Sequence, residues 1–232
     1  KSTYYARQNS SVQNEPALTV TTKYFNRFRN TNTINYDATF KKIHKLTVLL
    51  GEETMATRSR TVTNQIDGIS DAFSPEDAFK YTVNGKYSSF NNYTDPDVKL
   101  LSFFGRANYD LMGRYLLTAT FRADGSSIFA PGQRWGYFPS VAVAWRLSDE
   151  KFMQGASKWL SNLKLRFSYG TAGNNNIDSD QYRSMYSAKN TAYLEQGTSY
   201  WTTGTQLYNP DLKWETTYTR NLGIDFGFWN NR

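Results

Sequence analysis

Strict alternation of apolar and polar residues near the C-terminus constrains this chain more than any other feature. The even positions of residues 221–228 are all large and apolar: Leu222, Ile224, Phe226 and Phe228. The odd positions are polar or glycine: Asn221, Gly223, Asp225 and Gly227. A period of two places the two sets on opposite faces of a β-strand, and a helical period fits neither set. The segment is therefore predicted to be a strand with one apolar face.

The same period recurs along the chain. It is clear in residues 33–40, 114–122 and 163–170, and weaker in residues 101–111, 141–147 and 46–50. Residues 1–6 are interpreted as the tail of an earlier strand. No run of the sequence approaches the roughly 18 apolar residues that a membrane-spanning helix needs. If this chain crosses a membrane, we expect it to cross with strands.

The aromatic content supports a membrane setting. The 232 residues include 17 Tyr, 15 Phe and 6 Trp, yet the mean hydropathy is only -0.66. A barrel wall reconciles these values, because every second residue faces lipid while its neighbours face a wet lumen. Aromatic residues near several strand ends are predicted to form a girdle at one membrane interface. These residues are Phe40, Tyr109, Tyr115, Trp145, Phe228 and Trp229.

Connection lengths give a second indication. Short connections are expected at residues 41–45, 111–113 and 230–232, an intermediate one at 127–134, and long polar ones at 51–97 and 174–211. Short and long connections thus alternate, which is typical of a barrel with tight periplasmic turns and long external loops. Residues 148–161 are longer than a turn where a short connection is due, and their pattern predicts a brief helix. The predicted fold is all-β: an antiparallel transmembrane β-barrel arc of about seven to eight strands.

Several motifs follow one another in a specific order. They are FGRANY (104–109), FRADGSSIF (121–129), RWGYFPS (134–140), LKLRFSYGTAGN (163–174) and NPDLKWE (209–215). Together they resemble the SusC/RagA-like TonB-dependent transporters, strongly over residues 99–232 and more loosely back to about residue 20. The resemblance implies a 22-stranded barrel in the outer membrane of a Gram-negative bacterium. Residues 1–232 are accordingly expected to be part of one TonB-dependent receptor β-barrel domain.

The resemblance also implies features outside this chain. Members of the family are similar in having an N-terminal plug, a TonB box that couples them to TonB, and a SusD-like surface lipoprotein that captures oligosaccharides or peptides. The plug, the TonB box and the remaining strands are absent from these 232 residues. The fragment alone is therefore not expected to transport anything.

Enzymatic chemistry finds no support in the residues. The chain has no cysteine, and its only histidine, His44, is expected to be a solvated residue in a short basic turn. A His-based triad and a His-rich metal site are therefore excluded, and no cofactor is expected. The formal net charge is +7, but Lys and Arg are scattered, so nucleic acid is not an expected partner. Residues 124–127 (DGSS) lack the spacing of a calcium or phosphate loop and are interpreted as structural.

Two groups of residues are candidates for contact with partners. One group is polar, lies on the predicted lumen face, and is expected chiefly to support the wall or hold the plug. Its members are Arg106, Asn108, Asp110, Arg122, Asp124, Asn221 and Asp225. The other group is aromatic, lies in the second long connection, and is a candidate for contact with ligand or with the lipoprotein. Its members are Tyr182, Tyr186, Tyr193, Tyr200 and Trp201.

Three functions remain open at this point. The leading hypothesis is TonB-dependent uptake of oligosaccharides or peptides with a SusD-like lipoprotein lid. The alternative is a TonB-dependent receptor for siderophores or vitamins, which shares the architecture and lacks the lid. The third is a soluble β-sandwich that binds carbohydrate, which would fold without detergent.

Overall fold

The structure is a computed structural model that describes residues 2–5, 16–70, 72–156, 158–178, 181–184, 186–190, 199–203 and 207–229. For residues 2–5, 187–190, 199–201 and 203 it describes the backbone alone. The chain divides into two compact units. The first contains residues 1–28 and 56–98, and the second contains residues 29–55 and 99–232.

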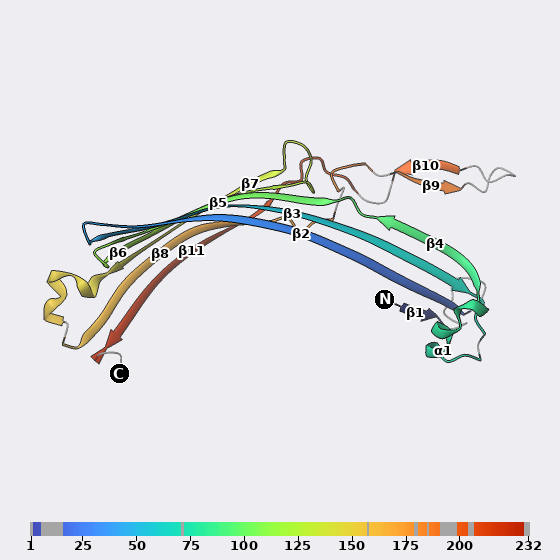
Figure 1. The fold of residues 1–232 in the computed structure, drawn as a ribbon, viewed down its shortest axis with the longest axis horizontal. Coiled ribbons are helices and arrows are strands. Elements are labelled where there is room, and N and C mark those ends of the chain that lie inside the picture. The colour runs from blue at the N-terminus through green and yellow to red at the C-terminus, as the bar shows by residue number, and fades with distance from the viewer. Residues whose placement is uncertain are drawn as a thin grey trace. The chain divides into compact units, whose positions relative to one another are not determined.

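The second unit is a curved antiparallel sheet (Figure 1), and its strands pair in chain order. It takes one part each of β2 (Ala17–Phe40) and β3 (His44–Asp67). The other strands are β5 (Val98–Leu111), β6 (Tyr115–Ser126), β7 (Trp135–Arg146), β8 (Leu160–Asn174) and β11 (Glu215–Phe228). Each strand pairs with its neighbours in this order, as in the wall of an up-and-down barrel.

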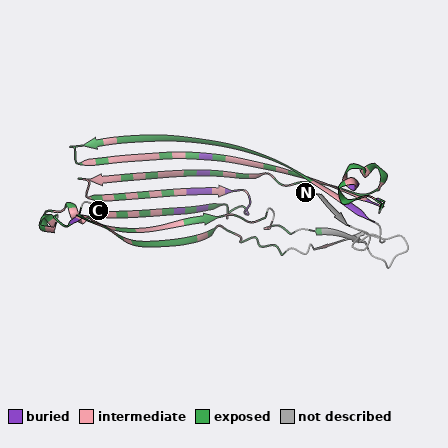
Figure 2. Cartoon of the chain, turned by 90° about the horizontal axis from the view of Figure 1, so that it is seen from below, coloured by how far each residue is buried: buried purple, intermediate pink, exposed green. Residues whose placement is uncertain are grey.

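The register gives the sheet one apolar and one polar face. One row across five strands reads Tyr109, Leu117, Val143, Phe167 and Leu222. The adjacent row, displaced by one residue, reads Asn108, Thr118, Ala142, Ser168 and Asn221. Four of the five apolar side chains, those of Leu117, Val143, Phe167 and Leu222, are exposed, and bands of different burial alternate along the strands (Figure 2). This arrangement confirms the predicted alternation in the four clearest segments and extends it across the sheet.

Strands β2 and β3 are much longer than predicted. Each contains 24 residues, whereas the alternation indicated only residues 33–40 and 46–50. Residues 51–67 were expected to begin a long polar connection, but β3 continues to Asp67. Polar residues occur at both odd and even positions of this segment, so apolar and polar residues do not alternate there. Its threonines nevertheless favour an extended backbone. The prediction of a connection starting at residue 51 was therefore wrong.

The first unit has a small core of its own. Leu18, Ile69 and Ala78 are buried together, and Ala78 lies in the short helix α1 (Pro75–Lys80). Ser74 caps this helix by accepting a hydrogen bond from the backbone N–H of Asp77 at 3.2 Å. The short strands β1 (Ser2–Tyr5) and β4 (Lys86–Thr94) pair with β2 and β3, so residues 1–6 do contain a strand. No helix among the described residues has the length and apolar character that a membrane span requires.

The connections differ between the two ends of the second unit. At one end, residues 41–43 and 112–114 are three-residue turns, and Gly113 adopts a positive φ of 71° that suits glycine. The predicted brief helix at this end is present as two 3₁₀ helices, η3 (Leu147–Asp149) and η4 (Lys151–Ala156). The longest connection at the other end, between β8 and β11, contains β9 (Tyr186–Asn190) and β10 (Ser199–Thr203), which pair as a hairpin.

Candidate functional site

All seven residues predicted to face a lumen lie on the polar face of the sheet. The register aligns Arg106 with Thr120, Asn108 with Thr118 and Asp124 with Ser102, and the alternation continues through β7 and β8 to β11. Residues from three different strands are thus brought to one surface. Hydrogen bonds and charges decide what this surface can do.

A compact ionic cluster occupies one part of the polar face. Arg122 donates from Nε to Asp124 at 2.8 Å and lies 4.0 Å from Glu53. Arg29 donates from Nε to Glu53 at 2.9 Å. The side chains of Glu53 and Asp124 are only 8% exposed, and two cations and two carboxylates balance within the cluster. Each of these buried carboxylates thus has a cationic partner, which buried carboxylates need.

Sequence reasoning missed half of this cluster. Glu53 lies in β3 at a position assigned to the polar connection, and Arg29 lies in the part of β2 that showed no alternation. The guanidinium of Arg122 also lies over the ring of Phe104, 5.4 Å from its centroid. Glu53 and Arg122 are charged residues in the polar phase of the two strands that flank β5. Their positions were the signal in the sequence that could have indicated this ion pair.

A second charged group lies where β8 meets β11. Arg166 donates from Nη2 to Asp225 at 2.6 Å, and Lys164 lies 3.7 Å from the same carboxylate. Gly223 leaves room for this arginine, since a Cβ there would lie 3.2 Å from its Nη2. Asp225 is therefore held within the wall.

The remaining polar residues on this face also bond locally, with one exception. Asn108 accepts from Thr118 at 2.9 Å, and Asp110 accepts from the backbone N–H of Gly113 at 2.6 Å. Asn221 donates to Ser168 at 3.3 Å. Within the described part of the chain, Arg106 is the one candidate of the seven whose side chain has no hydrogen-bonding or ionic partner. Arg106 is exposed, so its charge is available to a group outside this sheet.

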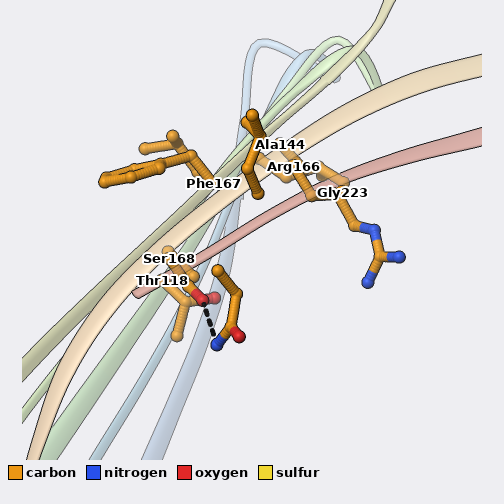
Figure 3. Close-up of a pocket in the computed structure, with 11 residues that line it drawn as sticks. Thr118, Ala144, Arg166, Phe167, Ser168 and Gly223 are labelled. Atoms are coloured by element: carbon orange, nitrogen blue, oxygen red, sulfur yellow. Dashed lines mark hydrogen bonds between the residues drawn. The ribbon is translucent and has the colours of Figure 1, made fainter. Parts of the chain in front are cut away.

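A shallow hollow of about 550 Å³ lies in the sheet beside these residues (Figure 3). Small side chains form much of its lining, notably Ala142, Ala144 and Gly223. Figure 3 shows Arg166 and Phe167, consecutive residues of β8, leaving the strand on opposite sides. The dashed line marks the hydrogen bond between Ser168 and Asn221. The lining comes from both phases of the strands, since Phe167 and Leu222 belong to the apolar row and Ser168 and Asn221 to the polar row.

The aromatic candidates of the second long connection do not form one described site. Tyr182 accepts a hydrogen bond from Arg183 Nε at 3.0 Å, and Tyr186 at the start of β9 is 61% exposed. Tyr200 and Trp201 lie in β10, where the structure describes their backbone alone. Tyr193 lies outside the described residues.

His44 differs from its prediction. It begins β3 instead of lying in the turn, and it is half-buried. Its Nδ1 lies 2.6 Å from the hydroxyl of Tyr109, and the two rings are stacked with centroids 6.0 Å apart. The expectation of a solvated turn residue was wrong. His44 is the first residue of β3, and its side chain lies on the outward face of the sheet beside Tyr109 of β5. No group of three or more potential metal-ligating side chains occurs among the described residues.

Residues from several motifs meet at the end of the sheet with long connections. Phe129 and Phe138 both contact Trp214, with ring centroids 5.5 and 5.4 Å apart. Trp214 Nε1 donates to the carbonyl of Arg134 at 2.8 Å. A Cβ on Gly136 would overlap Phe138, so the glycine is required for this close approach. The motifs thus build a local core that holds the connection 127–134 against the segment 207–214.

Comparisons with known proteins agree with this geometry. The family model for the TonB-dependent receptor-like β-barrel matches residues 1–232. TonB-dependent receptor SusC of Bacteroides thetaiotaomicron is 46% identical over 136 residues, covering 57% of this chain and 14% of the relative. TonB-dependent receptor P26 of Formosa agariphila is 33% identical over 231 residues, covering 94% of this chain and 21% of the relative.

Solved structures show the same sheet. The RagAB peptide transporter is 28% identical with a TM-score of 0.78, covering 97% of this chain and 24% of that one. The RagAB peptide importer in its closed-closed state is 26% identical with a TM-score of 0.79, covering 100% and 25%.

These matches exclude the soluble sandwich and place the apolar face of the sheet against the outer membrane. The chain spans about a seventh to a quarter of the proteins it matches. The family is one of receptors and transporters and not an enzyme class. A two-faced antiparallel sheet and a family match over residues 1–232 lead to one assignment: this chain belongs to the TonB-dependent receptor-like β-barrel family, and it is of the SusC/RagA type.

Proposed function

We propose that the receptor to which this chain belongs imports oligosaccharides or peptides across the outer membrane, with energy supplied through TonB. The observation that carries the proposal is the two-faced sheet, apolar outside and polar inside, in a chain 46% identical to SusC over 136 residues. The RagAB structures are of a peptide transporter, which supports peptides as the second substrate class. A SusD-like lipoprotein is the proposed partner at the cell surface.

The polar face is proposed to meet the plug and the transport path. Arg122, Asp124 and Asp225 are neutralised within the wall and support it. Asn108, Asp110 and Asn221 are bonded locally and add to the same support. Arg106 faces the lumen with an unneutralised charge and contacts the plug or an anionic group on the substrate.

The second long connection is proposed to contact substrate or lipoprotein. Tyr182, Tyr186, Tyr193, Tyr200 and Trp201 supply flat aromatic surfaces among hydroxyl and amide side chains. Such surfaces stack on the apolar faces of sugars and pack against aromatic or aliphatic peptide side chains. The exposure of Tyr186 supports this assignment.

Growth of a strain lacking the full-length receptor tests the function. We expect the strain to lose growth on one glycan or peptide source and to recover it with the intact gene, but not with a copy lacking the TonB box. Co-purification of a surface lipoprotein with the receptor would support the lid. A defect confined to iron limitation or to growth without a supplied vitamin would contradict the proposal and favour the siderophore or vitamin receptor.

Substitution of two arginines tests the polar face. Arg106→Gln is expected to reduce uptake several-fold without changing the heat resistance of the folded barrel, because its charge has no partner in the wall. Arg122→Gln is the matched control, and it is expected to lower heat resistance, because it leaves Glu53 and Asp124 buried beside each other without this cation. Equal effects of the two substitutions on heat resistance would contradict the separate roles.

A further inference from the structure

The connection between β7 and β8 folds against the apolar face of the sheet. Glu150, between η3 and η4, accepts hydrogen bonds from the Tyr115 hydroxyl at 2.6 Å and from Trp145 Nε1 at 3.0 Å. Tyr115 and Trp145 are register partners whose rings stack 6.2 Å apart. Both belong to the same phase as Leu117 and Val143, so the connection is fastened to the outward side of the wall.

Aromatic contacts fasten the rest of this connection. Phe152 meets Trp145 edge to face at 6.5 Å, and Trp159 stacks on Phe228 at 6.0 Å. The backbone N–H of Trp229 donates to the carbonyl of Trp159 at 3.0 Å. Despite these contacts, Phe152 is 67%, Trp159 50% and Trp229 65% exposed. Three large rings are thus attached to the sheet while at least half of each residue's surface is exposed.

Basic residues accompany these rings. Lys151, Lys158 and Arg146 are exposed, while Arg114 lies 3.5 Å from Glu150 and neutralises it. Asp149 is the other acidic residue of the segment. The surface formed by residues 146–156, 158, 159 and 229 is here called the foot. Together with Arg114 it carries four basic and two acidic side chains, and hence net positive charge, beside apolar rings.

Its position in the fold restricts what can cover it. The strands that flank the foot cross the outer membrane with their apolar faces in hydrocarbon, so the outward side at a strand end lies at the lipid headgroups. The other two connections of the second unit at this end, residues 41–43 and 112–114, are three-residue turns. The foot is far longer than a strand reversal requires, and it is directed toward the lipid.

We propose that the foot binds the phosphate headgroups of anionic phospholipids in the membrane leaflet at the short-turn end of the barrel. Lys151 and Lys158 pair with the phosphates, while Phe152, Trp159 and Trp229 lie among the glycerol and upper acyl groups. Exposed rings flanked by lysines match a headgroup in both charge and polarity.

A fluorescent label on the foot tests the proposal in the full-length receptor. This chain has no cysteine, and any cysteine elsewhere in the receptor is first replaced by serine. Gly155→Cys accepts a bimane label, because no heavy atom lies within 4 Å of a Cβ at this position. In phosphatidylcholine nanodiscs we expect phosphatidylglycerol with a headgroup nitroxide to quench the label several-fold more strongly than phosphatidylcholine with the same nitroxide. Lys151→Gln with Lys158→Gln should remove most of that preference, since the two lysine charges that attract the anionic headgroup are lost.

A label at Met112→Cys, in a three-residue turn at the same end, is the control and should show no preference for phosphatidylglycerol. Equal quenching by the two nitroxide lipids, unchanged by the lysine substitutions, would overturn the headgroup site. Quenching of the Gly155 label by aqueous iodide alone would place the foot in water and would also overturn it. Protection from both iodide and the nitroxide lipids would show that protein covers the foot, which would equally contradict the proposal.

Discussion

The two ends of the second unit use the same residue types in opposite ways. At the end with long connections, Phe129 and Phe138 are 1% and 6% exposed and pack around Trp214. At the end with short turns, Phe152 and Trp159 are also held by ring contacts, yet at least half of each surface is uncovered. Ring contact alone therefore does not distinguish a protein core from a surface that a membrane completes.

The difference teaches where the stability of each end originates. A buried ring contributes through the apolar area that the protein itself removes from water. An exposed ring at a membrane interface contributes only when lipid covers it. The first end should therefore be insensitive to the surrounding amphiphile, and the second should depend on it.

Truncating one ring at each end is the strongest test of this comparison. Phe129→Ala should destabilise the folded receptor by about 3–5 kcal/mol, because it removes a buried ring and leaves a cavity beside Trp214. Phe152→Ala should change stability little in detergent. Urea unfolding of the full-length receptor, followed by gel mobility, measures both effects. Similar losses for the two variants would show that the short-turn end also has a protein core.

The two faces between these ends allow a second test with neighbouring residues. Ala119 lies in the outward phase of β6, and Thr118 lies in the polar phase beside Ala142. Ala119→Arg should destabilise the receptor by about 2–4 kcal/mol in bilayers, as expected for a cation placed near the membrane midplane. Thr118→Arg should lose only about 1 kcal/mol, from its hydrogen bond to Asn108.

The test asks which of the two variants, Ala119→Arg or Thr118→Arg, loses more stability. A larger loss for Thr118→Arg would mean that the polar face is more tightly packed than the outward face in the complete barrel. That outcome would break the assignment of the two faces.

The sequence predicted one-sided strands well because the membrane enforces their pattern. In β11 every outward residue from Leu222 to Phe228 must be apolar, so alternation is strong and its interpretation was correct. In β3 beyond residue 50 the alternation disappears, since polar residues occupy both phases, and the strand was missed. Hydrophobic periodicity indicates which strands contact lipid, and it cannot identify a strand that has no apolar face.

Side-chain partners were harder to predict for a different reason. Arg29 and Glu53 are 24 residues apart, and their bond depends on the register between two strands. Arg122 and Glu53 belong to strands that are not even neighbours in the sheet. A one-residue slip in either pairing would move these side chains to the opposite face. The sequence could therefore place Arg122 on the polar face, but it could not identify its partner.

The smallest expected effect concerns the carboxylate that fastens the foot. Hydrogen bonds from Tyr115 and Trp145, together with the nearby charge of Arg114, hold the pKa of Glu150 below its ordinary value of 4.5. A depressed pKa in the folded state stabilises the protein above about pH 4.5, and this contribution is lost as the pH falls through the lower folded value. The wild-type receptor should therefore have a slightly higher melting temperature than Glu150→Gln at neutral pH, and this difference should disappear in acid. Asp149→Gln is the control, because Asp149 accepts no hydrogen bond from Tyr115 or Trp145. It should show a smaller difference in melting temperature from wild type. A difference for Glu150→Gln that stays constant into acid would mean that the ionised carboxylate does not hold the connection against the wall.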